Sequence, residues 1–152
     1  IRPEQYFGKS LTKLTIDEVI EWQTESVSQG SKSSAAGKYQ IIKKTLIDLV
    51  DNKGAAARTD KFNQVTQDKL CRKLLQGRGI DDYLAGSKSE QAFCRSLAQE
   101  WASLPVTYRQ PGAKRTVNPG ESYYSGDGLN KSRIAPADFI ASVRNIKETG
   151  YT

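Results

Sequence analysis

The sequence predicts a mainly α-helical fold: a single domain with one small β element and long loops rich in glycine and proline. Apolar residues recur three and four positions apart in five segments, which is the periodicity of one helix face. Alternation of apolar and polar residues, the pattern of a half-buried strand, is rare. The 152 residues have the length of one domain and can bury most of the surface of the unfolded chain.

The first predicted helix begins at Ile16 and ends near Glu25. Thr15 and Glu18 have the spacing of a capping box, in which each side chain accepts a hydrogen bond from the backbone N–H of the other residue. Apolar residues then follow at helical spacing: Ile16, Val19, Ile20 and Trp22. A loop containing Gly30 and several serines separates this helix from the next.

The second and third predicted helices span Gln40–Val50 and Asn63–Leu75. The second ends before the polar run Asp51–Gly54, and the third ends before Gly77. On the third helix we expect one buried face, formed by Val65, Leu70, Leu74 and Leu75.

The fourth predicted helix follows a second capping box, formed by Ser87 and Glu90. Its inward face comprises Phe93, Leu97, Trp101 and Leu104. Residues 106–131 are predicted to be a long loop region with room for a short hairpin, and such loops are often functional. Pro136 opens the fifth helix, whose inward residues are Phe139, Ile140, Val143 and Ile146.

The net charge of the chain limits the classes of partner. The formal charge is +6 and the pI is about 9.3, so the surface suits an anionic partner such as nucleic acid, an anionic membrane or a cell wall. Basic and acidic residues are interspersed without a tract of five or six basic residues, which argues against nucleic acid. No apolar run approaches the roughly 20 residues that span a bilayer, so we expect no membrane span.

Histidine, cysteine and methionine usage narrows the chemistry. The chain has no histidine, which excludes Ser-His and Cys-His nucleophile pairs, and its two cysteines are too few for a structural zinc site. Cys71 and Cys94 are open to two interpretations: two buried thiols, or a disulfide between two helices. Because the chain lacks methionine and begins at Ile1, we expect the natural protein to start upstream.

The most informative segment is the run of small residues from Ser33 to Ala36, which closes on Gly37, Lys38, Tyr39 and Gln40. Small residues let a backbone lie close to a ligand. We expect the tyrosine and glutamine to enter the first turn of the second helix, where one can stack and the other can hydrogen-bond. That combination suits a flat, polar polymer such as a sugar chain. The alternative is a helix N-terminus with small capping residues.

An ordered series of motifs resembles the phage lysozyme-like lytic transglycosylases of the lambda endolysin type and related virion-associated enzymes. The series covers most of residues 8–131. It comprises Leu11–Val19 through Trp22-Gln23, Ser34–Gln40, Thr66-Gln67-Asp68, Arg78-Gly79, Leu97–Pro105 and Gly120–Tyr124. The order of the motifs is more specific than any one of them.

This resemblance implies a lysozyme-like fold, mainly α with a small β element, across residues 1–152. It implies cleavage of the β-1,4 bond between N-acetylmuramic acid and N-acetylglucosamine in peptidoglycan. The muramic C6 hydroxyl attacks within its own sugar and leaves a 1,6-anhydro product, with one glutamic acid moving the protons. The expected protein is a monomer that uses no metal or cofactor. It acts in the phage virion, with virion components as partners, or in the host periplasm and cell wall.

The catalytic acid of the family lies well upstream of the small-residue motif, so we expect it before residue 1. The candidate within the chain is Glu25, which ends a helix and precedes Ser26; the alternative is a solvated helix-end residue. By resemblance, the substrate-binding residues of the motif are Ser34, Gly37, Lys38, Tyr39 and Gln40. In the glycine-rich loop, Tyr123 and Tyr124 are predicted to stack against sugars. Packing is the alternative for all three tyrosines.

Three other functions stay open beside the transglycosylase. The chain can be a wall-binding module without its acid, or a cell-wall endopeptidase. A basic helical domain that binds nucleic acid is the third alternative, and it predicts binding with a steep salt dependence.

Overall fold

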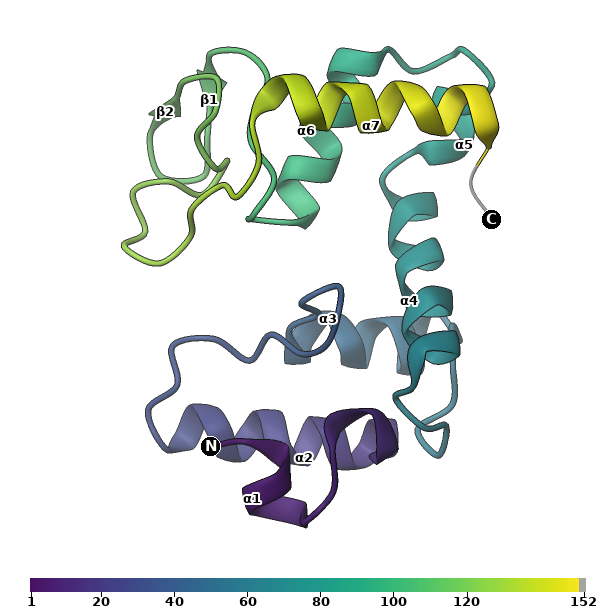
Figure 1. Cartoon of the computed structure of the whole chain (residues 1–152), viewed down its shortest axis with the longest axis vertical. Helices are drawn as coiled ribbons and strands as arrows, with labels where there is room; N and C mark the ends of the chain where they lie inside the picture. The colour runs from purple at the N-terminus through teal and green to yellow at the C-terminus, as the bar shows by residue number, and fades with distance from the viewer. Residues whose placement is uncertain (151–152) are drawn as a thin grey trace. The chain divides into compact units, whose positions relative to one another are not determined.

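A computed structural model describes residues 1–150, and it divides the chain into two compact units, residues 1–73 and residues 74 onward. The described residues form seven α-helices and one two-stranded sheet, so the predicted mainly α fold with a small β element is confirmed (Figure 1). Among these residues, no helix combines the length and the apolar composition that crossing a membrane requires. A single domain over the whole chain stays a prediction.

The first unit is built around helix α2 (Ile16–Ser28). Its predicted capping box is confirmed: the Thr15 hydroxyl accepts a bond from the Glu18 backbone at 3.2 Å, and the Glu18 carboxylate accepts one from the Thr15 backbone at 2.9 Å. The other elements are α1 (Pro3–Phe7), the 3-10 helix η1 (Leu11–Lys13), α3 (Lys43–Ile47) and its π-helical continuation η2 (Asp48–Asn52). Helix α4 (Gln64–Gly77) begins in this unit and runs into the second.

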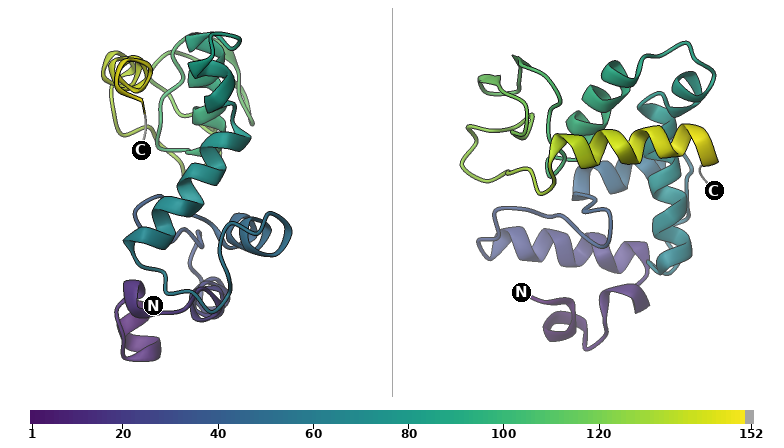
Figure 2. Two further views of the ribbon diagram at one scale, coloured as in Figure 1. Left: turned by 90° about the vertical axis from the view of Figure 1, so that its right-hand side faces the viewer. Right: turned by 45° about the horizontal axis from the view of Figure 1, so that its top comes forward.

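The second unit packs three helices, α5 (Ile80–Leu84), α6 (Glu90–Glu100) and α7 (Pro136–Thr149), around one apolar core. Its buried members are Ile80, Tyr83, Phe93, Cys94, Leu97, Phe139 and Val143. Strands β1 (Gln110–Pro111) and β2 (Thr116–Val117) pair antiparallel. Figures 1 and 2 show the β1–β2 sheet and the loop after it beside the N-terminal end of α7.

The prediction of a second helix over Gln40–Val50 is wrong at its start. Helix α3 begins at Lys43, and η2 carries the helical turns on to Asn52. Gln40 cannot enter a helix because its φ of 52° lies in the left-handed region. Of the small residues before it, Ala36 and Gly37 belong to a β-hairpin instead of a helix entry.

Two details of the other helices also differ from prediction. The cap of α6 is Ser89, whose hydroxyl accepts a bond from the Ala92 backbone, and Ser87 instead donates to the Asp82 carbonyl. The helix ends at Glu100, so Trp101 has extended backbone. On α4, Val65 is 65% exposed and does not share the buried face with Leu70.

The two cysteines carry thiols, because no disulfide occurs within residues 1–150. Cys71 is half-buried on α4, whereas Cys94 is buried on α6. Burial, reinforced by the charge of Glu90, raises the pKa of the Cys94 thiol to about 11. The interpretation as a disulfide is therefore wrong. The interpretation as two buried thiols is confirmed for Cys94, whereas Cys71 is a thiol that is only half-buried.

Candidate functional site

Residues 36–41 form a tight β-hairpin that holds four of the predicted sugar-binding residues: Gly37, Lys38, Tyr39 and Gln40. Ala36 and Ile41 exchange two backbone hydrogen bonds of 3.0 Å, and the Gln40 N–H donates to the Gly37 carbonyl at 3.2 Å. Gly37 has a φ of 76°, which glycine adopts without steric cost. Lys38 and Tyr39 therefore occupy the tip of the hairpin.

Gly37 is required by a close contact as well as by its backbone conformation. A Cβ atom at this position would lie 2.3 Å from Gln67 Oε1 and 2.8 Å from Phe62 Cε2. The Gln67 side chain is buried and uses both ends of its amide: Oε1 accepts from the Lys38 N–H at 2.9 Å, and Nε2 donates to the Phe62 carbonyl at 2.9 Å. Gln67 thus binds the tip of the hairpin to α4.

Tyr39 makes a second bond from the hairpin to α4. Its hydroxyl donates to the Asp68 carboxylate at 2.7 Å. This hydrogen bond, together with partial desolvation, raises the pKa of Tyr39 to about 12. The Lys38 ammonium lies 5.4 Å from the centre of the Tyr39 ring. Lys38 is exposed and Tyr39 is half-buried. Because the Tyr39 hydroxyl is bonded to Asp68, a ligand at this tip would meet the Lys38 ammonium and the exposed part of the Tyr39 ring.

Gln40 is exposed and conformationally strained. Among residues 1–150 it is the one non-glycine residue with a positive φ. Such a conformation costs a residue with a Cβ about 1–2 kcal/mol, and strain of this kind clusters at functional sites. The residue is exposed, and its side-chain amide donates to the Gly37 carbonyl at 2.7 Å.

Ser34 connects the hairpin to its surroundings. Its hydroxyl accepts from the Lys43 N–H at 3.0 Å, at the start of α3, and its carbonyl accepts from Gln23 Nε2 at 2.8 Å. The predicted substrate contact of Ser34 therefore has a structural alternative, because both of its polar groups already hold neighbouring segments.

Tyr123 and Tyr124 belong to the second unit, where packing accounts for much of their surface. Their rings meet edge to face with centroids 5.2 Å apart. Tyr123 packs against the small core cluster of Ala98, Val106 and Val117, and the Arg95 guanidinium lies 5.9 Å from its ring centre. The Tyr124 hydroxyl donates to the Gln99 carbonyl, and burial raises its pKa. These contacts favour the alternative of loop packing over sugar stacking.

Glu25, the candidate acid within the chain, has polar surroundings. It is half-buried near the end of α2, and its carboxylate accepts from Gln29 Nε2 at 2.8 Å. Tyr6 lies close enough to feel this carboxylate: partial desolvation and then the negative charges of Glu21 and Glu25 raise the pKa of Tyr6. The catalytic role of Glu25 stays a prediction.

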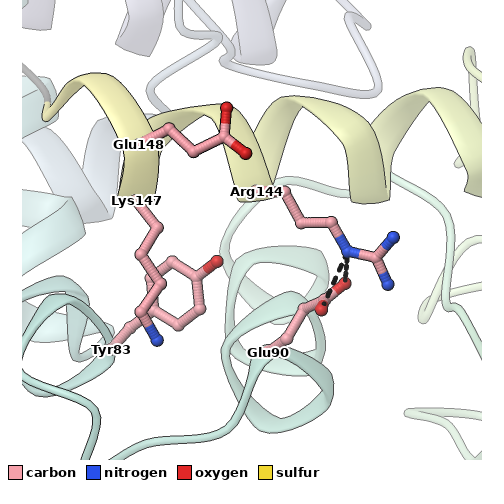
Figure 3. A pocket seen from close by; sticks show the side chains of 5 residues that line it. All are labelled: Tyr83, Glu90, Arg144, Lys147 and Glu148. Carbon is pink, nitrogen blue, oxygen red and sulfur yellow. Dashed lines mark hydrogen bonds and ion pairs between the residues drawn. The ribbon is translucent and has the colours of Figure 1, made fainter.

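The charged clusters of the second unit are satisfied internally. Arg78 pairs with the largely buried Glu100 at 3.0 Å. Figure 3 shows an open pocket in which Arg144 pairs with Glu90 at 2.9 Å, while the ammonium of Lys147 lies 4.8 Å from the centre of the Tyr83 ring. The contacts of Arg144 and Lys147 join α7 to α6 and to α5.

Sequence reasoning assigned no role to Gln67 and Asp68, although the run Thr66-Gln67-Asp68 was part of the resemblance. The structure brings both side chains to the hairpin. The only signal in the sequence was their place in that ordered series of motifs.

Comparison with known proteins gives one family. A family model described as Endolysin matches residues 21–128, well over half of the 152 residues. No curated protein and no solved structure matches the chain.

Proposed function

Because the chain belongs to the endolysin family of phage enzymes that degrade bacterial peptidoglycan, we propose that it cleaves the glycan strand itself. The proposed reaction is that of a lysozyme-like lytic transglycosylase, or muramidase, at the β-1,4 bond between N-acetylmuramic acid and N-acetylglucosamine. The matched range includes the hairpin of residues 36–41 and its partners on α4.

The observation that carries this proposal is the hairpin of residues 36–41. It holds an aromatic ring, an ammonium and a strained glutamine within three consecutive residues, Lys38, Tyr39 and Gln40. Aromatic rings pack against the apolar faces of sugars, while amides bond to sugar hydroxyl and acetamido groups. A protease site has no need of such a surface, so the hairpin favours glycan cleavage over peptide cleavage.

In the proposed reaction, a glutamic acid protonates the glycosidic oxygen as the bond to the leaving N-acetylglucosamine breaks. The muramic C6 hydroxyl forms a new bond to C1 of the same sugar and returns its proton to the carboxylate. Atoms and charges balance without water, which is why the product is a 1,6-anhydro sugar. One carboxylate is enough for this reaction, whereas a hydrolase commonly needs two.

The charge of the chain supports an anionic polymer as the partner. The formal charge of +6 is opposite in sign to that of the bacterial wall, and it favours association at moderate salt. We place the enzyme in the phage virion or in the host periplasm, as a monomer that acts without metal or cofactor.

The test is an analysis of products from purified peptidoglycan. Mass spectrometry of soluble fragments should detect 1,6-anhydromuramyl ends, which borohydride does not reduce. Reducing muramic ends would identify a hydrolase instead. Release of peptides from intact glycan strands would identify an endopeptidase, and retention on the wall without turnover would identify a binding module.

A companion variant addresses the acid. If Glu25 is the proton donor, Glu25→Gln abolishes release of anhydro products while the melting temperature stays near that of the wild type. A matched control is Glu21→Gln on the same helix, which should leave product release unchanged. Equal release by wild type and both variants removes Glu25 from the chemistry.

A further inference from the structure

Gln23 is a polar residue in the middle of an apolar helix face. It lies one turn beyond Val19 on α2, and its exposed fraction is 0%. Burying an amide is unfavourable unless it is hydrogen-bonded, so a residue in this position is typically aliphatic. The partners of Gln23 therefore explain its presence.

Its amide nitrogen binds the segment that leads into the hairpin and the last residue of the hairpin. Nε2 donates to the Ser34 carbonyl at 2.8 Å and to the Ile41 carbonyl at 3.0 Å. Both partners are acceptors, so only the NH₂ end of the amide can make these bonds and the orientation of the side chain is fixed. The Ile41 carbonyl also accepts the bond from Ala36 that closes the hairpin.

The other end of the same amide is left unsatisfied. Gln23 Oε1 is buried, and no donor among the described residues reaches it. An unmade bond of this kind costs about 1–3 kcal/mol, and two made bonds return about 0.5–1.5 kcal/mol each. The two contributions nearly cancel, so the bonds of the Gln23 amide add little net stability of their own.

We propose that Gln23 is a positioning residue for the glycan-binding hairpin, an inference that rests on the proposed function. Gln67 and Asp68 fix the tip of the hairpin to α4. Gln23 fixes the base of the hairpin to α2, through Ser34 just before it and through Ile41 at its end. With both attachments in place, Gln40 is held in its strained conformation. Without Gln23, the ends of the hairpin are free to shift and the tip no longer matches the sugar.

The test compares Gln23→Met with Ile20→Val. Methionine keeps the length of the side chain and removes both donors. Ile20→Val removes one methylene-sized group from the same helix and leaves every hydrogen bond to the hairpin. For each full-length protein, the measurements are the melting temperature, the affinity for a soluble tetrasaccharide of alternating N-acetylglucosamine and N-acetylmuramic acid, and amide hydrogen exchange at Lys38 and Gln40.

We expect the two variants to melt within a few degrees of each other. Gln23→Met should bind the tetrasaccharide about tenfold more weakly than the wild type, and its Gln40 amide should exchange faster, while Ile20→Val should match the wild type in both measurements. Wild-type affinity in Gln23→Met would overturn the proposal. Equal loss of affinity in both variants would also overturn it, because the effect would then follow stability.

Failure of the variant to fold and failure of the proposed function can be told apart from failure of the Gln23 proposal. If Gln23→Met does not fold, Gln23→Asn replaces it. Asparagine keeps the amide but holds it one methylene farther from both carbonyls. Weaker binding of the tetrasaccharide by Gln23→Asn supports the positioning role of Gln23, and unchanged binding refutes it. If the wild-type chain does not bind the tetrasaccharide, the proposed function fails. The amide exchange rates at Lys38 and Gln40, compared between the wild type and Gln23→Met, then show whether Gln23 holds the hairpin in its conformation.

Discussion

The Tyr39 hydroxyl lies 2.7 Å from the Asp68 carboxylate and joins the tip of the hairpin to α4. Beside it, the Lys38 N–H donates to Gln67, the residue that precedes Asp68 on the helix. Consecutive residues of the hairpin thus bind consecutive residues of α4. This pairing attaches the tip of the hairpin to α4 at two successive positions.

The Tyr39–Asp68 bond should be measurable by a double-mutant cycle of Tyr39→Phe, Asp68→Ala and the double variant. A hydrogen bond to a charged group contributes about 1.5–3 kcal/mol when it is buried. Both residues are half-buried, so we expect a coupling of about 1 kcal/mol in the free energy of unfolding. Urea denaturation provides the values. Additive effects of the two single variants would show that the bond contributes nothing to stability.

Gly37→Ala should destabilise the chain far more than Gly54→Ala. The two glycines have similar φ values, 76° and 61°, so the backbone penalty of about 1 kcal/mol is common to both. A Cβ at Gly54 meets nothing within 4 Å, whereas one at Gly37 lies 2.3 Å from Gln67 Oε1. We therefore expect Gly37→Ala to cost about 2 kcal/mol more than Gly54→Ala in urea denaturation. Equal costs would contradict the close contact.

Gln40→Gly should separate stability from binding. Glycine relieves about 1–2 kcal/mol of left-handed strain, which stabilises the folded chain. It also gives the unfolded chain more conformational entropy, which destabilises the folded chain by about 0.4–1 kcal/mol. The variant also loses the hydrogen bond from the Gln40 amide to the Gly37 carbonyl, which offsets part of the gain. The free energy of unfolding should therefore stay close to that of the wild type. The affinity for the tetrasaccharide should fall severalfold, because the exposed amide is lost.

The matched control is Lys38→Gly at the neighbouring tip position, whose φ is not positive. Here glycine relieves no strain, so the free energy of unfolding should fall by about 0.4–1 kcal/mol. A Gln40→Gly variant that is destabilised to the same extent would show that the conformation of Gln40 is not strained.

The helices were largely predictable because their signals are local. Thr15 and Glu18 lie three residues apart, and the apolar stripe of α2 needs only the helical period to be recognised. The same holds for α7, where Pro136 begins the helix and Phe139 and Val143 face inward. The predicted cap of α6 failed because Ser87 and Ser89 are equally good capping residues, and only the turn made by Asp82 selects between them.

The hairpin was not predictable because its determinants are far apart in the sequence. Small residues before Gln40 are as typical of a helix N-terminus as of a turn. What selects the hairpin is the fit of Gly37 against Gln67, 30 positions along the chain, and the buried amide of Gln23. Both glutamines are polar residues on helices, which composition assigns to the surface.

Alkaline titration should reveal the Tyr39–Asp68 bond through the pH dependence of stability. The pKa of Tyr39 is about 12 in the folded chain and near 10 when unperturbed, with the Asp68 hydrogen bond as the main cause. A raised pKa means that the folded state favours the protonated phenol. Its contribution to stability is fully present below pH 10 and is lost as the pH rises from 10 to 12.

The wild-type free energy of unfolding should therefore fall more steeply between pH 10 and pH 12 than that of Tyr39→Phe. Comparing the two removes the contributions of Tyr83 and Tyr124, whose pKa values are also raised and which both proteins share. In an Asp68→Ala background, Tyr39→Phe should change the slope much less, because the acceptor that holds the phenolic proton is gone. Identical slopes for wild type and Tyr39→Phe would mean that Tyr39 ionises as freely in the folded chain as in the unfolded one, and that the bond to Asp68 does not persist in solution.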